Sequence, residues 1–325
     1  MKAFTYARAT TAAEGVAAAA SGARLLAGGT DLLPLMKARL LSPDHVVDIS
    51  RLGEGWDAVA EAPDGGLRIG ACCTLAQVAA QPRIRAEYAA LAEAAASAGS
   101  PQIRNTATLG GNLCQWNRCW YFRGGIPCHL SGGDGCPAAQ GDNRHHAIFR
   151  DGPCVAVHPS DPAVALLALG ADVELVGPCG PRRLPLAEFL RAPRPGDPDP
   201  TQRLPGEVVA AVTLPPACAS RSAYHKAMDR QAWAFALVSA AVVLQVSGGV
   251  VTEAAVVLGG VAPLPYRAAA AEDYLRGRRL TAPVAAEAAA AGLEAAQPLA
   301  GNGYKVALAA AVFVAALLAC CPEVA

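Results

Sequence analysis

The chain has 325 residues, of which 53% are hydrophobic, and its 27 Lys and Arg residues balance 27 Asp and Glu residues. This length allows two or three domains, and the apolar composition supports a packed core and excludes a largely disordered chain. The formal net charge of zero excludes the basic surface of a typical nucleic-acid-binding protein and favours association with other subunits.

The first 50 residues predict alternating helices and strands around a glycine turn. Gly28 and Gly29 separate a short strand from the helix after it, and Thr30 or Asp31 has a side chain suited to cap that helix. The predicted order is helix, strand, helix and strand, over residues 12–20, 24–27, 32–40 and 45–49.

The next part of the chain predicts a second mixed region. Thr74 can cap a helix, Gly99 ends a long helix, and Ser160 precedes a further apolar helix. The predicted strands are 67–71 and 172–176, and the predicted helices are 87–98 and 163–169.

A proline-rich segment divides the sequence. Residues 191–207 contain five prolines, which exclude a helix or central strand and indicate an exposed linker or long loop. We therefore expect one domain over residues 1–190 and another over 208–325. The second domain contains strand-like or buried segments at 236–246 and 254–258, and helices at 272–278, 284–296 and 306–321. The last of these has 16 residues, fewer than the ~20 of a membrane-spanning helix, so no membrane span is expected.

Two loops combine glycine with small hydroxyl residues. In the first, residues 27–31, glycines let backbone N–H groups approach an anion, and the following helix adds partial positive charge. The second, residues 102–112, contains Thr108, Gly110 and Gly111. A double glycine alone is common in ordinary tight turns, but two such loops in one domain can hold the pyrophosphate of a dinucleotide. Neither loop matches the G-x-G-x-x-G pattern of a Rossmann site.

Cysteines are concentrated behind the second loop. Residues 1–11 lack the features of a secretory signal, so metal ligation is expected for the cysteines rather than disulfides. Their total of 11 is odd, which excludes full pairing. No C-x₂-C pair typical of zinc occurs in the Cys-rich segment, so its spacing favours an iron–sulfur cluster over a structural zinc site. The five cysteines of this segment are Cys114, Cys119, Cys128, Cys136 and Cys154.

Five stretches of the sequence resemble the FAD-binding subunit of the molybdenum hydroxylase family, the group of xanthine dehydrogenases and aldehyde oxidoreductases. They are LLAGGTDLLPLMK, QIRNTATLGGNLC, HPSDPAVALLALGADV, KAMDRQAWAFALVSAAV and VVLGGVAPLPYRA. The resemblance covers nearly the whole chain and implies an α+β fold. It implies a two-subdomain FAD-binding domain of the vanillyl-alcohol-oxidase type, followed by a small α+β flavoprotein domain at the C-terminus.

The same resemblance implies which residues hold the FAD. Residues 25–33 are expected to wrap the pyrophosphate, the second loop to hold it from the other side, and two further residues to lie near the flavin. The implied residues are Leu25, Leu26, Ala27, Gly28, Gly29, Thr30, Asp31, Leu32, Leu33, Thr108, Gly110, Gly111, Asn112, Asp161 and Lys226.

A subset of this family carries an inserted segment, here about residues 113–155, that binds a [4Fe-4S] cluster. The implied ligands are Cys119, Cys128, Cys136 and Cys154. For the fourth ligand, the 4-hydroxybenzoyl-CoA reductase type has a cysteine where His145 stands here, whereas the aldehyde oxidoreductase type uses the cysteine before HPSD, which is Cys154. The similarity is greater to the second type. Cys114 is the main alternative ligand, and His145 is a more distant one.

The resemblance implies an electron-transfer subunit that carries FAD and a [4Fe-4S] cluster, with no catalytic residue of its own. Its expected partners are a small [2Fe-2S] subunit, a large molybdenum-cofactor subunit that oxidises an aldehyde or heterocycle, and an external electron acceptor. The expected location is the cytoplasm, or the periplasm if a partner's signal exports the complex. Two alternatives stay open: a stand-alone flavin oxidase of the vanillyl-alcohol type, and a zinc-stabilised assembly subunit with a vestigial nucleotide site.

Overall fold

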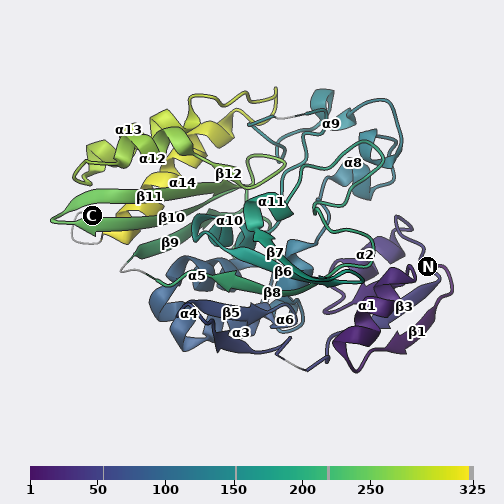
Figure 1. Cartoon of the computed structure of the whole chain (residues 1–325). Helices are drawn as coiled ribbons and strands as arrows, with labels where there is room; N and C mark the ends of the chain where they lie inside the picture. Colours follow the sequence, from purple (N-terminus) through teal and green to yellow (C-terminus); the bar gives the residue numbers. More distant parts are fainter. Residues whose placement is uncertain (54, 151, 218–219, 322–325) are drawn as a thin grey trace.

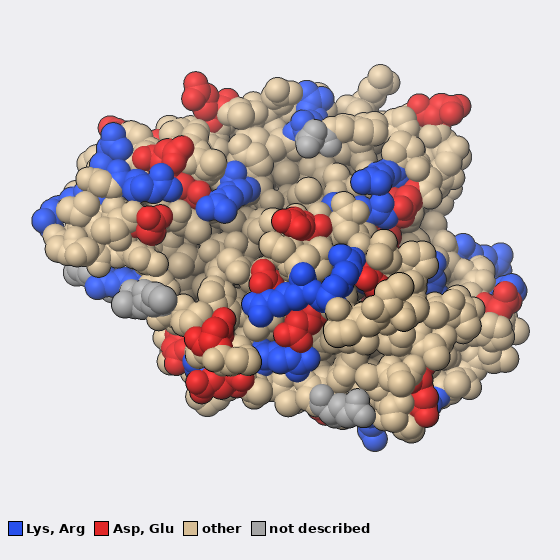
Figure 2. Space-filling view, in the orientation of Figure 1, with Lys and Arg blue, Asp and Glu red and all other residues tan. Residues whose placement is uncertain are grey.

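The computed structural model describes residues 1–53, 55–150, 152–217 and 220–321. Its named strands form three sheets, of three, five and four strands. In Figure 1 the N-terminal elements (purple) and the C-terminal elements (green to yellow) lie at opposite ends, with the five-stranded sheet between them. Figure 2 shows acidic and basic side chains intermixed over this face of the molecule.

The first 50 residues form a small parallel sheet with the strand order β1-β3-β2. Thr11 begins the first helix, because its side chain accepts a hydrogen bond from the Glu14 backbone N–H. The predicted elements of this region are confirmed, whereas β1 was not predicted because its four residues are all exposed. The elements are β1 (Thr5–Arg8), α1 (Ala12–Ala20), β2 (Arg24–Leu26), α2 (Leu32–Lys37) and β3 (His45–Asp48).

The second sheet is antiparallel, with the order β4-β5-β8-β6-β7. Its strands are β4 (Val59–Glu61), β5 (Leu67–Gly70), β6 (Asp172–Gly177), β7 (Gly180–Pro185) and β8 (Val208–Leu214). Strands of this sheet share one hydrophobic core with α3, α5 and α10. The helices of this part are α3 (Leu75–Ala80), α4 (Pro82–Glu87), α5 (Ala89–Ser97), α6 (Pro101–Arg104), α7 (Leu109–Leu113), α10 (Asp161–Ala168) and α11 (Leu186–Phe189).

The predicted helix over 87–98 is confirmed as α5, which begins after Tyr88. The buried side chain of Tyr88 donates a hydrogen bond to the Pro215 carbonyl from an irregular backbone position between α4 and α5. The predicted domain boundary needs correction. Residues 191–207 were expected to link two domains, but β8, which follows them, pairs with both β5 and β6. The division between the two halves of the chain therefore lies after Leu214, and the proline-rich segment is a loop of the first half.

The C-terminal part is an antiparallel sheet of order β12-β11-β10-β9 covered by three helices, as the predicted α+β class requires. Its elements are β9 (Arg221–Ala227), β10 (Val238–Ser247), β11 (Val250–Gly259), β12 (Tyr266–Arg267), α12 (Ala269–Leu275), α13 (Ala282–Leu293) and α14 (Tyr304–Cys320). The predicted C-terminal helix is thus confirmed as α14, which packs on β10 and buries Phe313 and Leu317. None of the helices in the described residues has the length and apolar character needed to cross a bilayer.

Residues 113–155, which we call the Cys segment, begin at the end of α7, and their described part then contains only short helical turns. These are α8 (Trp120–Arg123), η1 (His129–Ser131) and α9 (Pro137–Gln140). The start of α14 holds the end of this segment in place. Lys305 donates hydrogen bonds to the carbonyls of His145, His146 and Gly260, and the Asn302 amide donates to the carbonyl of His146.

The buried Lys305 gives the fold a specific dependence on pH. Burial lowers the pKa of Lys305 from 10.5 to about 7. Between these values the unfolded chain binds a proton that the folded chain largely lacks, so the free energy of unfolding should rise with pH. We expect this residue to add about 2 kcal/mol between pH 7 and 9. Urea unfolding of Lys305→Met should lack that increase, and an equal pH dependence in both proteins would contradict the assignment.

Candidate functional site

The two glycine loops predicted from the sequence lie against each other. The first glycine loop, residues 27–31, joins β2 to α2, and the second, residues 102–112, runs from α6 into α7. A Cβ atom added to Gly28 would stand 2.0 Å from the Thr106 carbonyl oxygen, so only glycine fits at this backbone crossing. The second loop is fixed in turn, because the Thr108 hydroxyl accepts a hydrogen bond from the Gly111 N–H.

The first glycine loop presents unpaired backbone donors. Within the described residues, the N–H groups of residues 28 to 32 have no hydrogen-bond acceptor. Gly29 adopts a φ of 69°, a left-handed conformation that favours glycine and here turns the chain between β2 and α2. A run of free N–H groups at the start of a helix attracts an anion such as a phosphate.

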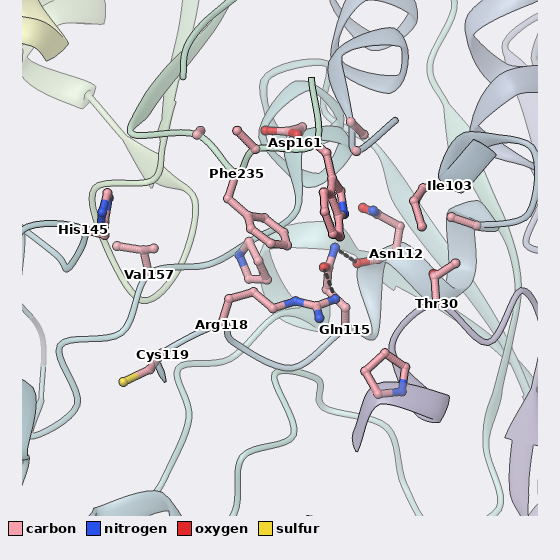
Figure 3. Close-up of a pocket in the computed structure, with 18 of the residues that line it drawn as sticks. Thr30, Ile103, Asn112, Gln115, Arg118, Cys119, His145, Val157, Asp161 and Phe235 are labelled. Atoms are coloured by element: carbon pink, nitrogen blue, oxygen red, sulfur yellow. Dashed lines mark hydrogen bonds between the residues drawn. The ribbon is translucent and has the colours of Figure 1, made fainter. Parts of the chain in front are cut away.

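Cavities open on both sides of the paired loops. The inner cavity, about 800 Å³, is lined by Thr30, Asn112, Asp161, Arg118, Trp233 and Phe235 among others. Figure 3 shows Arg118 and Phe235 side by side in this cavity, with Asn112 and Thr30 across from them. The outer groove, about 610 Å³, is lined by residues of both glycine loops. Thr30 lines both spaces, so one extended ligand can pass over the loops from one to the other.

Most of the residues predicted to hold FAD line one of these spaces. Those in the outer groove are Leu25, Ala27, Gly28, Gly29, Thr30, Asp31, Leu32, Thr108, Gly110 and Gly111, and those in the inner cavity are Thr30, Asn112 and Asp161. Leu26 and Leu33 line neither, because their side chains lie beside Gly29. Lys226 also lines neither and instead contacts Asp161.

Several residues that line the inner cavity or the outer groove were not predicted from the sequence. Arg118 and Gln115 enter the inner cavity from the Cys segment, and Trp233 and Phe235 from the β9–β10 connection. The proline-rich loop supplies Arg191 and Arg203 to the outer groove, where each donates a hydrogen bond to Thr201. No local pattern marks these residues as ligands, because their positions depend on β8 and β10 returning to sheets that are distant in sequence.

Asp161 and Lys226 form a buried ion pair under the inner cavity. The Lys226 ammonium lies 2.7 Å from Asp161 Oδ2 and donates to the Ser97 carbonyl, while the Tyr224 hydroxyl donates to Asp161 Oδ1. The side chains of the pair are only 3% and 7% exposed, so neither charge has water to replace its partner. The pair ties β9 to α10 and α5 beside the cavity.

Lys226→Met should therefore lower the free energy of unfolding by about 3–5 kcal/mol, because it leaves the Asp161 carboxylate buried without its cation. The double variant Asp161→Asn/Lys226→Met should regain part of this loss. Urea unfolding of the three proteins measures both effects. A loss below about 1 kcal/mol in the single variant would show that the pair contributes little.

The four cysteines predicted as ligands come together. Cys119, Cys128, Cys136 and Cys154 line one small cavity of about 10 Å³, which we call the cysteine cavity. Phe122, Leu130 and Ala156 complete its walls. These four cysteines form no disulfide. The fold thus brings four cysteines that are separated in sequence to one cavity.

Local structure aims donors at these sulfurs. Cys119, Cys128 and Cys136 each stand at the N-cap of a short helix, namely α8, η1 and α9. The Ser131 hydroxyl donates to Cys128 Sγ, and His146 Nε2 lies 3.3 Å from Cys119 Sγ. Burial raises the pKa of Cys154 to about 12, and the neighbouring sulfurs add to the rise. Such thiols are deprotonated at neutral pH only beside a strong positive charge, which a metal centre supplies.

The two alternative ligands lie elsewhere. Cys114 lines the outer groove near Arg203, not the cysteine cavity. His145 lines the inner cavity, where its ring meets Trp120 edge-on. Within the described residues, no three His, Cys, Asp or Glu side chains converge closely enough to hold a single metal ion.

Two family models cover nearly the whole chain. Residues 2–217 match the FAD binding domain in molybdopterin dehydrogenase, and residues 222–320 match the CO dehydrogenase flavoprotein C-terminal domain. These matches agree with a division after β8.

Comparison with individual proteins identifies the same family. The chain is 43% identical over 281 residues to the FAD-binding subunit of an aldehyde oxidoreductase from Escherichia coli, covering 85% of this chain and 86% of that subunit. It superposes on a chain of carbon monoxide dehydrogenase from Hydrogenophaga pseudoflava with a TM-score of 0.76 and 28% identity, covering 99% and 98%. Quinoline 2-oxidoreductase from Pseudomonas putida shares the fold, with a TM-score of 0.77, 23% identity and coverage of 100% and 99%. The predicted resemblance and fold are therefore confirmed, and this chain belongs to the family of FAD-binding medium subunits of molybdenum hydroxylases, which are parts of oxidoreductase complexes.

Proposed function

We propose that this chain is the electron-transfer subunit of a molybdenum-dependent oxidoreductase that acts on aldehydes or aromatic heterocycles, and that it carries one FAD and one [4Fe-4S] cluster. It receives electrons from a small [2Fe-2S] subunit, while a large molybdenum-cofactor subunit oxidises the substrate, and delivers them to an external acceptor. The complex lies in the cytoplasm, or in the periplasm if a partner carries an export signal. The single observation that carries the cluster proposal is the cysteine cavity, which adjoins the inner cavity.

The residues present suit FAD. Free N–H groups of the first glycine loop can bind the pyrophosphate, and Gly28 lets that loop lie directly on the second. The inner cavity on one side and the outer groove on the other offer space for the two ends of the molecule. Bound FAD supplies the redox chemistry, and the protein supplies its placement and the surrounding charges.

The cysteine cavity suits an iron–sulfur cluster better than zinc. Tetrahedral zinc with bonds of about 2.3 Å needs its sulfurs about 3.8 Å apart, converging on one point. The described side chains provide no such convergence, although four cysteines surround the same cavity. A four-iron cluster is held by four thiolates that are set farther apart around a common centre. Buried aromatic and aliphatic neighbours, such as Phe122 and Leu130, keep water away from the cysteine cavity.

The two cofactor sites adjoin each other. Cys119 and Ala156 line both the cysteine cavity and the inner cavity, so a single layer of protein separates them. Trp120, next to Cys119, also lines the inner cavity and contacts His145 and His146. This adjacency supports electron exchange between the cluster and the flavin, a question that the sequence left open.

Chemical analysis of the anaerobically purified chain tests this proposal. We expect one FAD with about four iron and four acid-labile sulfide per chain. Zinc in place of iron would support the assembly-subunit alternative. Flavin without metal would refute the cluster and retain only the FAD part of the proposal. The stand-alone oxidase alternative predicts that the purified chain alone oxidises an alcohol substrate. It is disfavoured because the relatives are subunits and medium chains of larger enzymes.

A further inference from the structure

Asp31 belongs to the first glycine loop, yet its carboxylate points to the Cys segment. Asp31 Oδ1 lies 2.8 Å from the Arg123 guanidinium and 3.0 Å from that of Arg118, and Oδ2 accepts a hydrogen bond from the Trp116 N–H at 2.9 Å. The Asp31 side chain is 14% exposed. Asp31 is the N-cap residue of α2, but its side chain makes no capping hydrogen bond. The carboxylate therefore binds the Cys segment and does not cap the helix.

The contacts continue toward the cysteine cavity. Arg123 also donates to the carbonyls of Trp116 and Asn117, and Asn117 Oδ1 accepts a hydrogen bond from the Cys119 backbone N–H. A hydrogen-bonded chain thus runs from the first glycine loop through Arg123 and Asn117 to Cys119. Arg118 stands immediately before Cys119 and lines the inner cavity, with its Nε buried and without a partner.

The charges of these residues determine how well the first glycine loop can bind an anion. A lone carboxylate beside a pyrophosphate site would repel the ligand, because two like charges at short range disfavour each other. Two arginines against one carboxylate leave a net positive charge next to the free N–H groups of the loop. The ordered Cys segment therefore turns an unfavourable residue of the loop into part of a favourable anion site.

We propose that Asp31 is a positioning residue that couples FAD binding to the order of the Cys segment, and through Cys119 to retention of the cluster. This inference rests on the proposed function for the cluster, whereas the coupling between FAD and the segment requires only the family's FAD. By linkage the effect is reciprocal: an ordered segment strengthens FAD binding by the factor by which FAD stabilises the segment.

Hydrogen exchange of the full chain, with FAD removed and then restored, tests the coupling without requiring the cluster. In the wild type we expect FAD to slow exchange in residues 113–155 about tenfold. In Asp31→Asn, FAD should bind but protect this segment much less than in the wild type, because only the segment residues that line the inner cavity still contact it. Arg123→Gln should behave in the same way. The double variant should show no further loss, because both changes break one connection. Asp142→Asn is the matched control: it removes an exposed ion pair within the segment that does not reach the loop, and should respond as the wild type does.

Two outcomes separate this inference from the proposed function. Equal protection of the segment by FAD in wild type and Asp31→Asn would overturn the coupling, even if iron analysis shows a full cluster. A chain that shows the coupling but binds no iron would retain the role of Asp31 toward FAD and refute the cluster. Thermal unfolding of the FAD-free variants shows whether either change disrupts the fold itself.

Discussion

Cys154→Ser is expected to reduce the iron content from about four per chain to less than one, while FAD stays bound. Cys154 is buried in the wall of the cysteine cavity, and a serine hydroxyl is a poor substitute for a thiolate ligand to iron. The glycine loops do not contact this residue directly, so the flavin absorption should remain. Iron and sulfide analysis together with the visible spectrum of the purified variant gives the result.

Cys114→Ser is the matched control for that experiment. Cys114 lies in the same stretch of sequence but lines the outer groove, so its substitution should leave iron and sulfide unchanged. Loss of the cluster in this variant, with retention in Cys154→Ser, would reverse the ligand assignment. Loss in both would indicate that the Cys segment is sensitive to any substitution.

Gly28→Val should abolish FAD retention. A Cβ atom at this position would stand 2.0 Å from the Thr106 carbonyl oxygen and 2.7 Å from its carbonyl carbon, so the two loops must separate. Because the contact is with backbone, no side-chain rotation can relieve it. We expect the variant to purify without flavin and to lose about 3 kcal/mol or more of unfolding free energy. Gly29→Ala should have a smaller effect, since it adds the cost of a left-handed conformation and crowds only leucine side chains.

Gly303→Ala provides the control for Gly28→Val. An added Cβ at Gly303 meets no atom within 4 Å, and its φ of −57° suits any residue. This variant should keep a full complement of FAD and the stability of the wild type, as judged by fluorescence of the released flavin and by thermal unfolding. Normal flavin content in Gly28→Val would contradict the placement of FAD on the paired loops.

The sequence was informative where residue type and local position agree. Gly28 and Gly29 follow a strand and precede a helix, and this order together with the second glycine loop predicts a phosphate site. The grouping of Cys119 with Cys154 came from family resemblance, since no regular spacing connects residues in such short turns. The structure brings them together because Lys305 of α14 and the backbone of Val261, just after β11, hold the end of the Cys segment.

Other features depend on contacts that no local pattern contains. β8 is buried at every residue, so its sequence resembles any core segment and does not reveal that it pairs with β5 and β6 in the second sheet. Tyr88, which separates α4 from α5, donates a hydrogen bond to Pro215, more than 100 residues away in sequence. The sequence predicts that Asp31 can cap a helix, but its carboxylate forms ion pairs with two arginines from the Cys segment. In each case tertiary contacts outweigh local propensity.

The most direct test of the account is a crystal structure of the anaerobically purified protein with anomalous data collected at the iron edge. We expect one compact iron peak enclosed by Cys119, Cys128, Cys136 and Cys154, and FAD density that crosses the two glycine loops at Thr30. An iron peak elsewhere, or a cysteine cavity without iron in protein that shows a full complement of FAD, would contradict it.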